Sequence, residues 1–259
     1  MMMSEAVGKP ADQAHISVRG LSVGYGDREV QSNLDFDIRR GSVFVIMGAS
    51  GCGKSTVLRA LIGLLEPFAG RVLYSDEDFW AADAAQREHL THGFGVMYQG
   101  GALWSSMTVA ENVALPLEEH TNLDATTIRQ LAELKLALVG LKGFEDFYPA
   151  QISGGMNKRV GVARALALDP QVLYFDEPSA GLDPISSRRL DDMLLALRDG
   201  LGCTMVLVTH ELDSIFTIAD DAILLDARSG TAIARGNPRH LRDHSEDERV
   251  RRFLRRGAA

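Results

Sequence analysis

Short apolar runs recur along the chain, and three of them have the length and composition of fully buried β-strands. Val43–Met47, Val172–Phe175 and Met205–Val208 are apolar at every position, which is typical of parallel strands that helices cover on both faces. After the first run, the segment 57–65 carries apolar residues at the spacing of a buried helix face. This alternation of strand and helix predicts an α/β domain built on a parallel sheet.

Other segments alternate between apolar and polar residues with a period of two. Ile16–Val23 and Leu34–Ile38 show this pattern near the start of the chain, which indicates half-exposed antiparallel strands attached to the core. Ala222–Asp226 and Thr231–Ala234 are joined through Ser229-Gly230 and predict a late β-hairpin.

The middle of the chain has a helical pattern instead. Thr108 begins a capping-box sequence, so we expect a helix to start there and to be disturbed at Pro116. Asp124 can cap a second helix, which ends at Gly140. We therefore predict a helical insertion over about residues 100–155 within the α/β core.

Length, composition and charge narrow the class of protein. The 259 residues are 46% hydrophobic and 24% charged, with a net charge of −8, as expected for a soluble globular protein without a nucleic-acid partner. Two cysteines suit a reducing compartment. No apolar run reaches about 18 residues, so we expect any membrane role to be peripheral. We divide the chain into a flexible tail (1–14), a main domain (15–235) and a charged, arginine-rich tail (236–259).

A glycine-rich loop follows the first apolar run. Gly48–Ser55 matches G-x-x-x-x-G-K-[ST] between a predicted strand and a predicted helix. Glycines let backbone N–H groups turn toward phosphates, Lys54 can reach the β- and γ-phosphates, and the Ser55 hydroxyl can ligate Mg²⁺. The expected phosphate-binding residues are Gly48, Ala49, Ser50, Gly51, Cys52, Gly53, Lys54, Ser55 and Thr56.

Two acidic residues end the second apolar run. A strand end delivers Asp176 to the edge of the sheet, where its carboxylate can hold the Mg²⁺ water shell. The adjacent Glu177 can then polarise a water that attacks the γ-phosphate. With the glycine-rich loop alone, these acids would fit a kinase, a GTPase or a helicase-like motor.

A second glycine pair separates these alternatives. In Ile152–Met156, Ser153 can cap a helix predicted over Asn157–Leu168, and Gly154 and Gly155 leave its first N–H groups accessible. The sequence therefore predicts a second anion site, remote from the first.

With these motifs in place, the chain resembles the nucleotide-binding subunit of an ABC transporter over nearly its whole length. The resemblance implies a P-loop NTPase (RecA-like) core with an antiparallel β-subdomain and an inserted α-helical subdomain, which binds ATP and Mg²⁺. It also implies that two subunits sandwich two ATP molecules. Ser153, Gly154, Gly155 and Met156 would then bind the γ-phosphate that the other subunit holds.

Further family motifs occur in the expected order. The resemblance assigns Tyr25 to adenine stacking, Gln99 to contact with Mg²⁺, water and the permease, Asp183 to the loop that crosses the dimer interface, and His210 to the γ-phosphate. One position departs from the family, because Met156 replaces the usual glutamine of the signature. Since the serine and both glycines are retained, we expect activity to be kept.

The sequence around the signature and Gln99 indicates a subfamily. Ser-Gly-Gly-Met, together with the segments 99–104, 108–113 and 116–121, looks like the ATPases of MCE-type lipid transporters, above all the phospholipid system that maintains outer-membrane lipid asymmetry (Mla). This resemblance implies a homodimer on the cytoplasmic face of the bacterial inner membrane. Its partners would be an integral-membrane permease and a periplasmic MCE-domain protein.

Several alternatives stay open at this point. The chain could be a non-transport ABC ATPase of repair or assembly, a nucleotide-binding module without turnover, or an importer of another hydrophobic substrate such as a sterol. Cys52 is either a redox-sensitive thiol or a small residue tolerated in the loop. The arginine-rich tail can contact lipid headgroups, a partner subunit or water.

Overall fold

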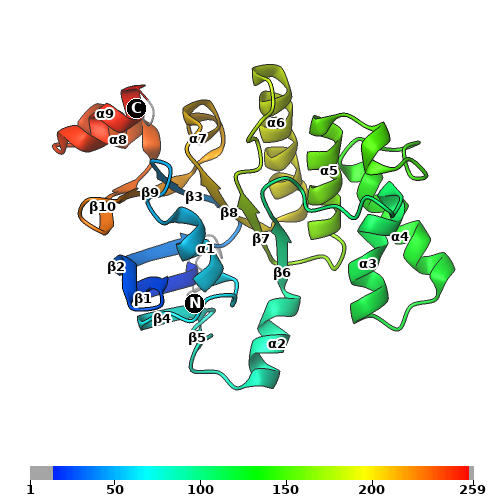
Figure 1. Ribbon diagram of the computed structural model, residues 1–259, viewed down its shortest axis with the longest axis horizontal. Coiled ribbons are helices and arrows are strands. Elements are labelled where there is room, and N and C mark those ends of the chain that lie inside the picture. The colour runs from blue at the N-terminus through cyan, green and yellow to red at the C-terminus, as the bar shows by residue number, and fades with distance from the viewer. Residues whose placement is uncertain (1–13, 257–259) are drawn as a thin grey trace, which may run out of the picture.

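A six-stranded sheet forms the centre of the computed structural model, which describes residues 14–256 (Figure 1). The strand order is β10-β9-β3-β8-β7-β6, and every neighbouring pair is parallel except β9 and β10. The strands are β3 (Val43–Gly48), β6 (Phe94–Met97), β7 (Val172–Asp176), β8 (Thr204–Thr209), β9 (Asp221–Asp226) and β10 (Thr231–Gly236). The predicted parallel strands and the late hairpin are confirmed.

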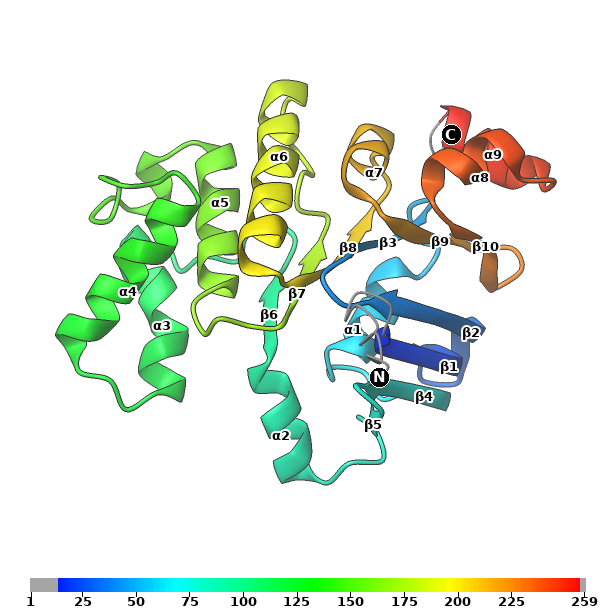
Figure 2. The same cartoon turned by 180° about the vertical axis from the view of Figure 1, so that it is seen from behind.

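Both faces of this sheet are buried. Successive side chains of a strand point to opposite faces, and each face packs in its own hydrophobic core. On β3, Val43, Val45 and Met47 join the core on one face, whereas Phe44 and Ile46 join the core on the other. Helices α5 (Gly154–Ala165), α6 (Pro184–Leu201) and α7 (Leu212–Ile218) cover one face. Helix α1 (Lys54–Leu61) and a second sheet cover the opposite face (Figures 1 and 2).

The second sheet is antiparallel and has the order β2-β1-β4-β5. Its strands are β1 (Ala14–Tyr25), β2 (Arg28–Arg39), β4 (Ala69–Tyr74) and β5 (Glu77–Asp78). The two alternating segments are antiparallel strands, as predicted, and they pair with each other, since Val18 faces Phe36 and Leu21 faces Leu34. The flexible tail predicted over 1–14 lies almost wholly outside the described residues.

The inserted segment contributes α3 (Val109–His120) and α4 (Ala125–Leu138), which lie beside α5 at one end of the sheet (Figure 2). Both predicted N-caps are present: Thr108 forms a reciprocal capping box with Glu111, and the Asp124 side chain accepts from Thr126 N and Thr127 N. Helix α3 continues through Pro116 to His120, because a proline removes only one backbone donor from a helix that is packed on others.

The helix predicted over Asn157–Leu168 is displaced in the structure. Helix α5 begins at Gly154 and ends at Ala165, three residues earlier at both ends. The predicted Ser153 cap is confirmed, since its side-chain oxygen accepts from Met156 N, and the glycine pair lies in the first turn of the helix.

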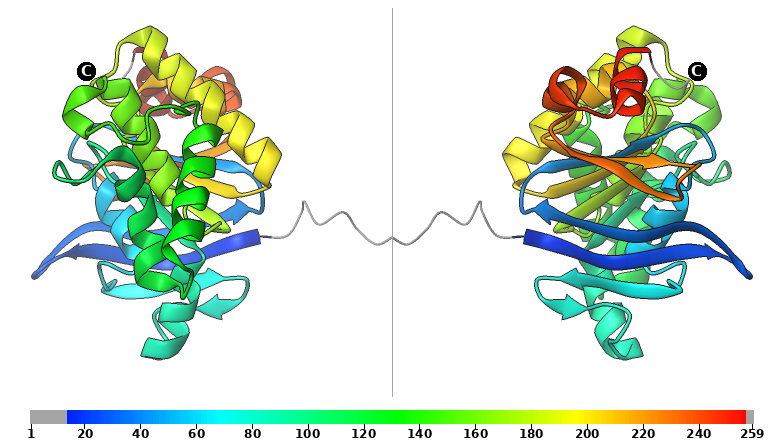
Figure 3. Two further views of the ribbon diagram at one scale, coloured as in Figure 1. Left: turned by 90° about the vertical axis from the view of Figure 1, so that its right-hand side faces the viewer. Right: turned by 90° about the vertical axis from the view of Figure 1, so that its left-hand side faces the viewer.

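The remaining helices are α2 (Ala84–His92), α8 (Pro238–His244) and α9 (Glu248–Arg256). The last two form the described part of the charged C-terminal segment and lie near β10, away from α3 and α4 (Figures 1 and 3). Within residues 14–256, no helix is both long and apolar enough to cross a bilayer. The domain boundaries given above stay predictions.

Candidate functional site

The loop between β3 and α1 has a backbone shape that glycine favours. Gly51 and Gly53 have φ values of 76° and 101°, where a side chain would be strained. A Cβ at Gly53 would also lie 2.7 Å from Val30 Cγ1. Gly53 occupies the N-cap position of α1 and offers no side-chain acceptor. The first N–H groups of α1 are therefore available to an oxyanion.

Lys54 is buried and lies across this loop. Its ammonium donates to Gly48 O at 3.0 Å and to Ala49 O at 3.2 Å. It also lies 3.7 Å from Glu177 Oε1. The carbonyls of the loop and the Glu177 carboxylate thus hold the Lys54 ammonium inside the glycine-rich loop.

Ser55 and Asp176 come together from different elements. The Ser55 hydroxyl donates to Asp176 Oδ1 at 2.9 Å, which ties the start of α1 to the end of β7. Burial raises the pKa of Asp176, the hydrogen bond from Ser55 opposes this, and the charge of Glu177 adds to the rise.

These oxygen donors fit a hard divalent cation such as Mg²⁺. In the described part of the chain, no group of three or more His, Cys, Asp and Glu residues could hold a metal ion. Mg²⁺ bound at Ser55 and Asp176 would therefore need phosphate or water oxygens to complete its coordination.

Glu177 has three unusual features. Its backbone has a φ of 49°, which is strained for a residue with a side chain. Its Oε1 accepts a hydrogen bond of 2.9 Å when His210 Nδ1 carries the proton. Its Oε2 is buried without a hydrogen-bond partner among the described residues. A carboxylate oxygen left in this state can accept a proton from a reactant.

One cavity of about 600 Å³ unites most of the expected site. Its lining residues are Tyr25, Arg28, Val30, Ser50, Gly51, Gly53, Lys54, Ser55, Thr56, Gln99, Glu177 and His210. Among them, Tyr25 is 46% exposed, and its hydroxyl accepts from Arg59 at 2.7 Å. The structure thus brings an exposed aromatic ring, a phosphate-type loop, an amide, a carboxylate and an imidazole into one space.

The signature residues lie outside this cavity. Ser153 and Gly155 line a separate cavity of about 420 Å³ between α4, α5 and α6. Asp183 caps α6 by accepting from Ile185 N and Ser186 N. Met156 packs against the hydrophobic core, which explains how a methionine can occupy this position. Within one chain, these residues do not meet the phosphate loop.

Two residues that contact the expected site were not predicted from the sequence. Gln31 on β2 is fully buried, and its Nε2 donates to Cys52 O at 2.8 Å and to Asp226 O at 3.3 Å. The sequence signal that could have indicated Gln31 is an amide side chain at an inward-facing position of a strand. Arg59 gave no such signal, since a basic residue near a helix C-terminus is common.

Cys52 is also buried in the loop, and burial raises the pKa of its thiol. A raised pKa keeps the thiol protonated and weakly reactive. This environment favours the interpretation of Cys52 as a small packing residue.

The chain matches the family model described as ABC transporter over residues 31–180. It is 36% identical over 243 residues to the intermembrane phospholipid transport system ATP-binding protein MlaF of Haemophilus influenzae, covering 94% of this chain and 91% of that protein. It is 38% identical over 239 residues to the probable ribonucleotide transport ATP-binding protein mkl of Mycobacterium leprae, covering 92% and 68%. The chain spans 66% of the Mycobacterium tuberculosis protein of that name.

Solved structures give the same result. cbiO1 from Clostridium perfringens, part of the ABC transporter complex cbiONQ, matches with a TM-score of 0.82 at 28% identity, over 95% of this chain and 96% of that chain. An ATP-binding cassette in a dimeric, post-hydrolysis state bound to ADP and Pi matches with a TM-score of 0.76 at 27% identity, over 86% and 98%.

Proposed function

This chain belongs to the ABC transporter family and is an ATPase, and from that premise we propose that it hydrolyses ATP to drive a phospholipid transporter. The observation that supports this most is the cavity that unites Tyr25, the phosphate-type loop, Gln99, Glu177 and His210. Proteins of the family bind ATP, generally with Mg²⁺.

In the proposed complex, adenine stacks on Tyr25 and the phosphates lie on the loop 48–56. Lys54 turns from the carbonyls of its own loop to the β- and γ-phosphates. Ser55, Asp176 and Gln99 would hold Mg²⁺, which neutralises charge on the phosphates when it is bound.

Glu177 is the proposed general base. Its buried Oε2 accepts a proton from water as the water oxygen bonds to the γ-phosphorus and the bond to the ADP oxygen breaks. His210 orients the other oxygen of the same carboxylate through the 2.9 Å contact. Lys54 Nζ lies 3.7 Å from that oxygen.

A second copy of the chain completes the proposed site. Ser153, Gly154, Gly155 and Met156 lie outside the cavity of their own chain, so only a partner subunit can bring them to the γ-phosphate. Asp183 would cross the same interface. The dimeric cassette bound to ADP and Pi supports this arrangement by similarity.

The proposed transporter also contains a permease and a periplasmic MCE-domain protein, with this chain peripheral on the cytoplasmic face of the inner membrane. The named phospholipid relatives support this cargo, because their match extends over 88–91% of their length. Tyr98 and Trp104, on either side of Gln99, are 38% and 58% exposed. Two exposed aromatic rings in the segment that contains Gln99 suit docking to a permease.

Phosphate release from ATP tests the proposed site. Glu177→Gln should abolish turnover while ATP binding persists, and Glu66→Gln, which changes an exposed glutamate, should leave turnover unchanged. Normal turnover by Glu177→Gln would show that another group is the base.

The transported substrate needs a separate experiment. The mycobacterial relative is named as a probable ribonucleotide transport protein, so ribonucleotides are the second candidate. The chain should be co-expressed with a candidate permease and assayed as the purified complex. Stimulation of ATP hydrolysis by phospholipid, but not by added ribonucleotides, supports our proposal. The reverse pattern favours the second candidate.

A further inference from the structure

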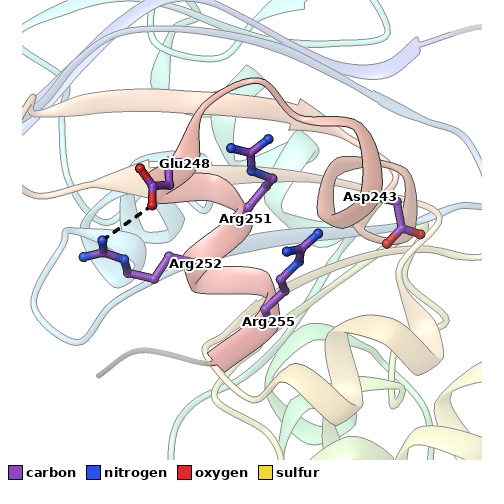
Figure 4. Close-up of a pocket in the computed structure, with 5 residues that line it drawn as sticks. All are labelled: Asp243, Glu248, Arg251, Arg252 and Arg255. Carbon is purple, nitrogen blue, oxygen red and sulfur yellow. Dashed lines mark ion pairs between the residues drawn. The ribbon is translucent and has the colours of Figure 1, made fainter.

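A basic groove, which shares no lining residue with the ATP cavity, lies between the last two described helices. Its volume is about 510 Å³, and its lining residues are Asp243 of α8 and Glu248, Arg251, Arg252 and Arg255 of α9. Figure 4 shows Arg251 and Arg255 projecting in the same direction from successive turns of α9, toward the side where Asp243 lies. Arg252 instead points toward Glu248.

Folding of the chain does not need this arginine face. Helix α9 packs on the domain through Val250, Phe253 and Leu254, all of which join the hydrophobic core. Arg252 and Arg255 are exposed. Other side chains therefore fasten the helix, and the guanidinium groups remain at the surface.

Nearby arginines have partners. Arg242 forms two hydrogen bonds with Asp243, at 2.8 and 3.0 Å. Arg249 contacts Asp226 at 3.0 Å and Asp247 at 2.6 Å. These pairs occupy Asp226, Asp243 and Asp247, of which Asp243 lines the groove.

Arg251 and Arg255 are different. Neither side chain has an ion pair or hydrogen bond with any described residue, although the two are spaced i, i+4 on one helix. Like charges at this spacing destabilise a helix. Because Arg242 and Arg252 already pair with the two acids of the groove, its unbalanced charge is positive. The chain as a whole has a charge of −8.

We propose that Arg251 and Arg255 bind the phosphate group of a ligand in this groove. The planar guanidinium fork matches phosphate oxygens bidentately, so two forks on one side can share a dianionic group. The groove is larger than one phosphate and has room for its substituent. A lipid headgroup and a phosphorylated small molecule share this chemistry.

Two probes distinguish these sources. Pyrophosphate is titrated into the full-length protein by calorimetry, in a Lys54→Ala background so that the ATP cavity does not compete. Vesicles of phosphatidylcholine, with and without phosphatidic acid, are tested by co-sedimentation with the same protein. Arg251→Gln/Arg255→Gln should weaken binding of the effective probe by at least tenfold. Arg251→Lys/Arg255→Lys should give an intermediate loss, because lysine keeps the charge without the fork.

Arg39→Gln/Arg71→Gln is the matched control, since it removes the same charge from exposed arginines of the antiparallel sheet. Selective loss of pyrophosphate binding in the groove variant supports a soluble ligand, and selective loss of binding to phosphatidic acid vesicles supports a lipid. Equal losses in groove and control variants would overturn the proposal, as would failure of both probes to bind. A melting temperature of the groove variant equal to that of the wild type would verify that the variant is folded.

Discussion

The starts of α1 and α5 are both glycine-rich helix N-termini, yet they differ in what their own chain provides. At α1 the N-cap is Gly53, no side chain caps the helix, and Lys54 and Glu177 lie within the same cavity. At α5 the N-cap is Ser153, its side chain satisfies Met156 N at 3.2 Å, and the adjoining cavity is a different one. The start of α1 lies beside the proposed catalytic groups, whereas the start of α5 has a side-chain cap and adjoins a different cavity.

If the proposed function holds, this difference allows ATP binding and hydrolysis to be separated. In that proposal, nucleotide affinity depends on groups around α1, all of which one chain contains. Turnover in the proposed dimer also depends on α5, whose N–H groups would reach phosphate only across the interface. Changes at α1 should therefore affect an isolated chain, and changes at α5 should affect the dimer.

Lys54→Ala should have the largest effect. Loss of the ammonium removes charge-assisted hydrogen bonds to phosphate, and we expect ATP affinity to fall by roughly 100-fold, or ~3 kcal/mol. Titration with a fluorescent ATP analogue measures this fall. Lys142→Ala changes an exposed lysine and should bind ATP as the wild type does. Equal ATP affinities for the two variants would show that Lys54 does not bind ATP.

Alanine at the two glycines sharpens the comparison. Gly53→Ala places a Cβ at a φ of 101° and 2.7 Å from Val30, so we expect ~2 kcal/mol of destabilisation in urea unfolding. A Cβ at Gly155 meets nothing closer than 3.8 Å. Gly155→Ala should keep the stability and ATP affinity of the wild type but lose turnover, because the Cβ obstructs a partner's phosphate. Equal destabilisation by both changes would contradict the comparison.

Stability should also depend on pH through α6, which packs beside α5. Burial raises the pKa of Asp191 to about 6, against the hydrogen bond that it accepts from Ser214 at 2.8 Å. Between about pH 4 and pH 6 the unfolded carboxyl is ionised while the folded one still holds its proton, so this group lowers stability as pH rises. Asp191→Asn should therefore gain ~1–2 kcal/mol relative to wild type between pH 4.5 and 7.5. A difference that does not change with pH would refute the assignment.

Ser153→Ala should have the smallest effect on stability. Loss of the cap at α5 costs about 1 kcal/mol, whereas α1 has no side-chain cap to lose. ATP affinity of the isolated chain should be unchanged, and phosphate release should fall. Thermal unfolding with a parallel ATP titration tests both statements, and reduced ATP affinity would place Ser153 in the site of its own chain.

The sequence predicts well where local chemistry decides the structure. Apolar runs predict β3, β7 and β8, and Thr108 and Asp124 predict two helix starts, because burial and capping depend on neighbouring residues. The predicted start of α5 is wrong by three residues although its Ser153 cap is confirmed, because glycine is a poor helix former and Gly154 and Gly155 nevertheless lie in the first turn.

Tertiary contacts were not predictable in the same way. Helix α2 has no buried residue and β5 has two residues, so neither has a hydrophobic pattern that indicates it. The roles of Gln31 and Arg59 depend on contacts with Cys52 and Tyr25 that only the folded chain creates. The motifs predict the ATP site, whereas the separation of α5 from the cavity that contains it required the structure.

The most direct test of a site assembled from two chains is the molecular mass of Glu177→Gln, measured by analytical ultracentrifugation with and without ATP and Mg²⁺. A site assembled from two chains predicts a monomer without nucleotide and a dimer at saturating ATP, because hydrolysis no longer separates the subunits. Adding Ser153→Glu in the same chain should return the protein to a monomer that still binds ATP. A monomer of Glu177→Gln at saturating ATP, or a dimer that Ser153→Glu leaves intact, would contradict the account.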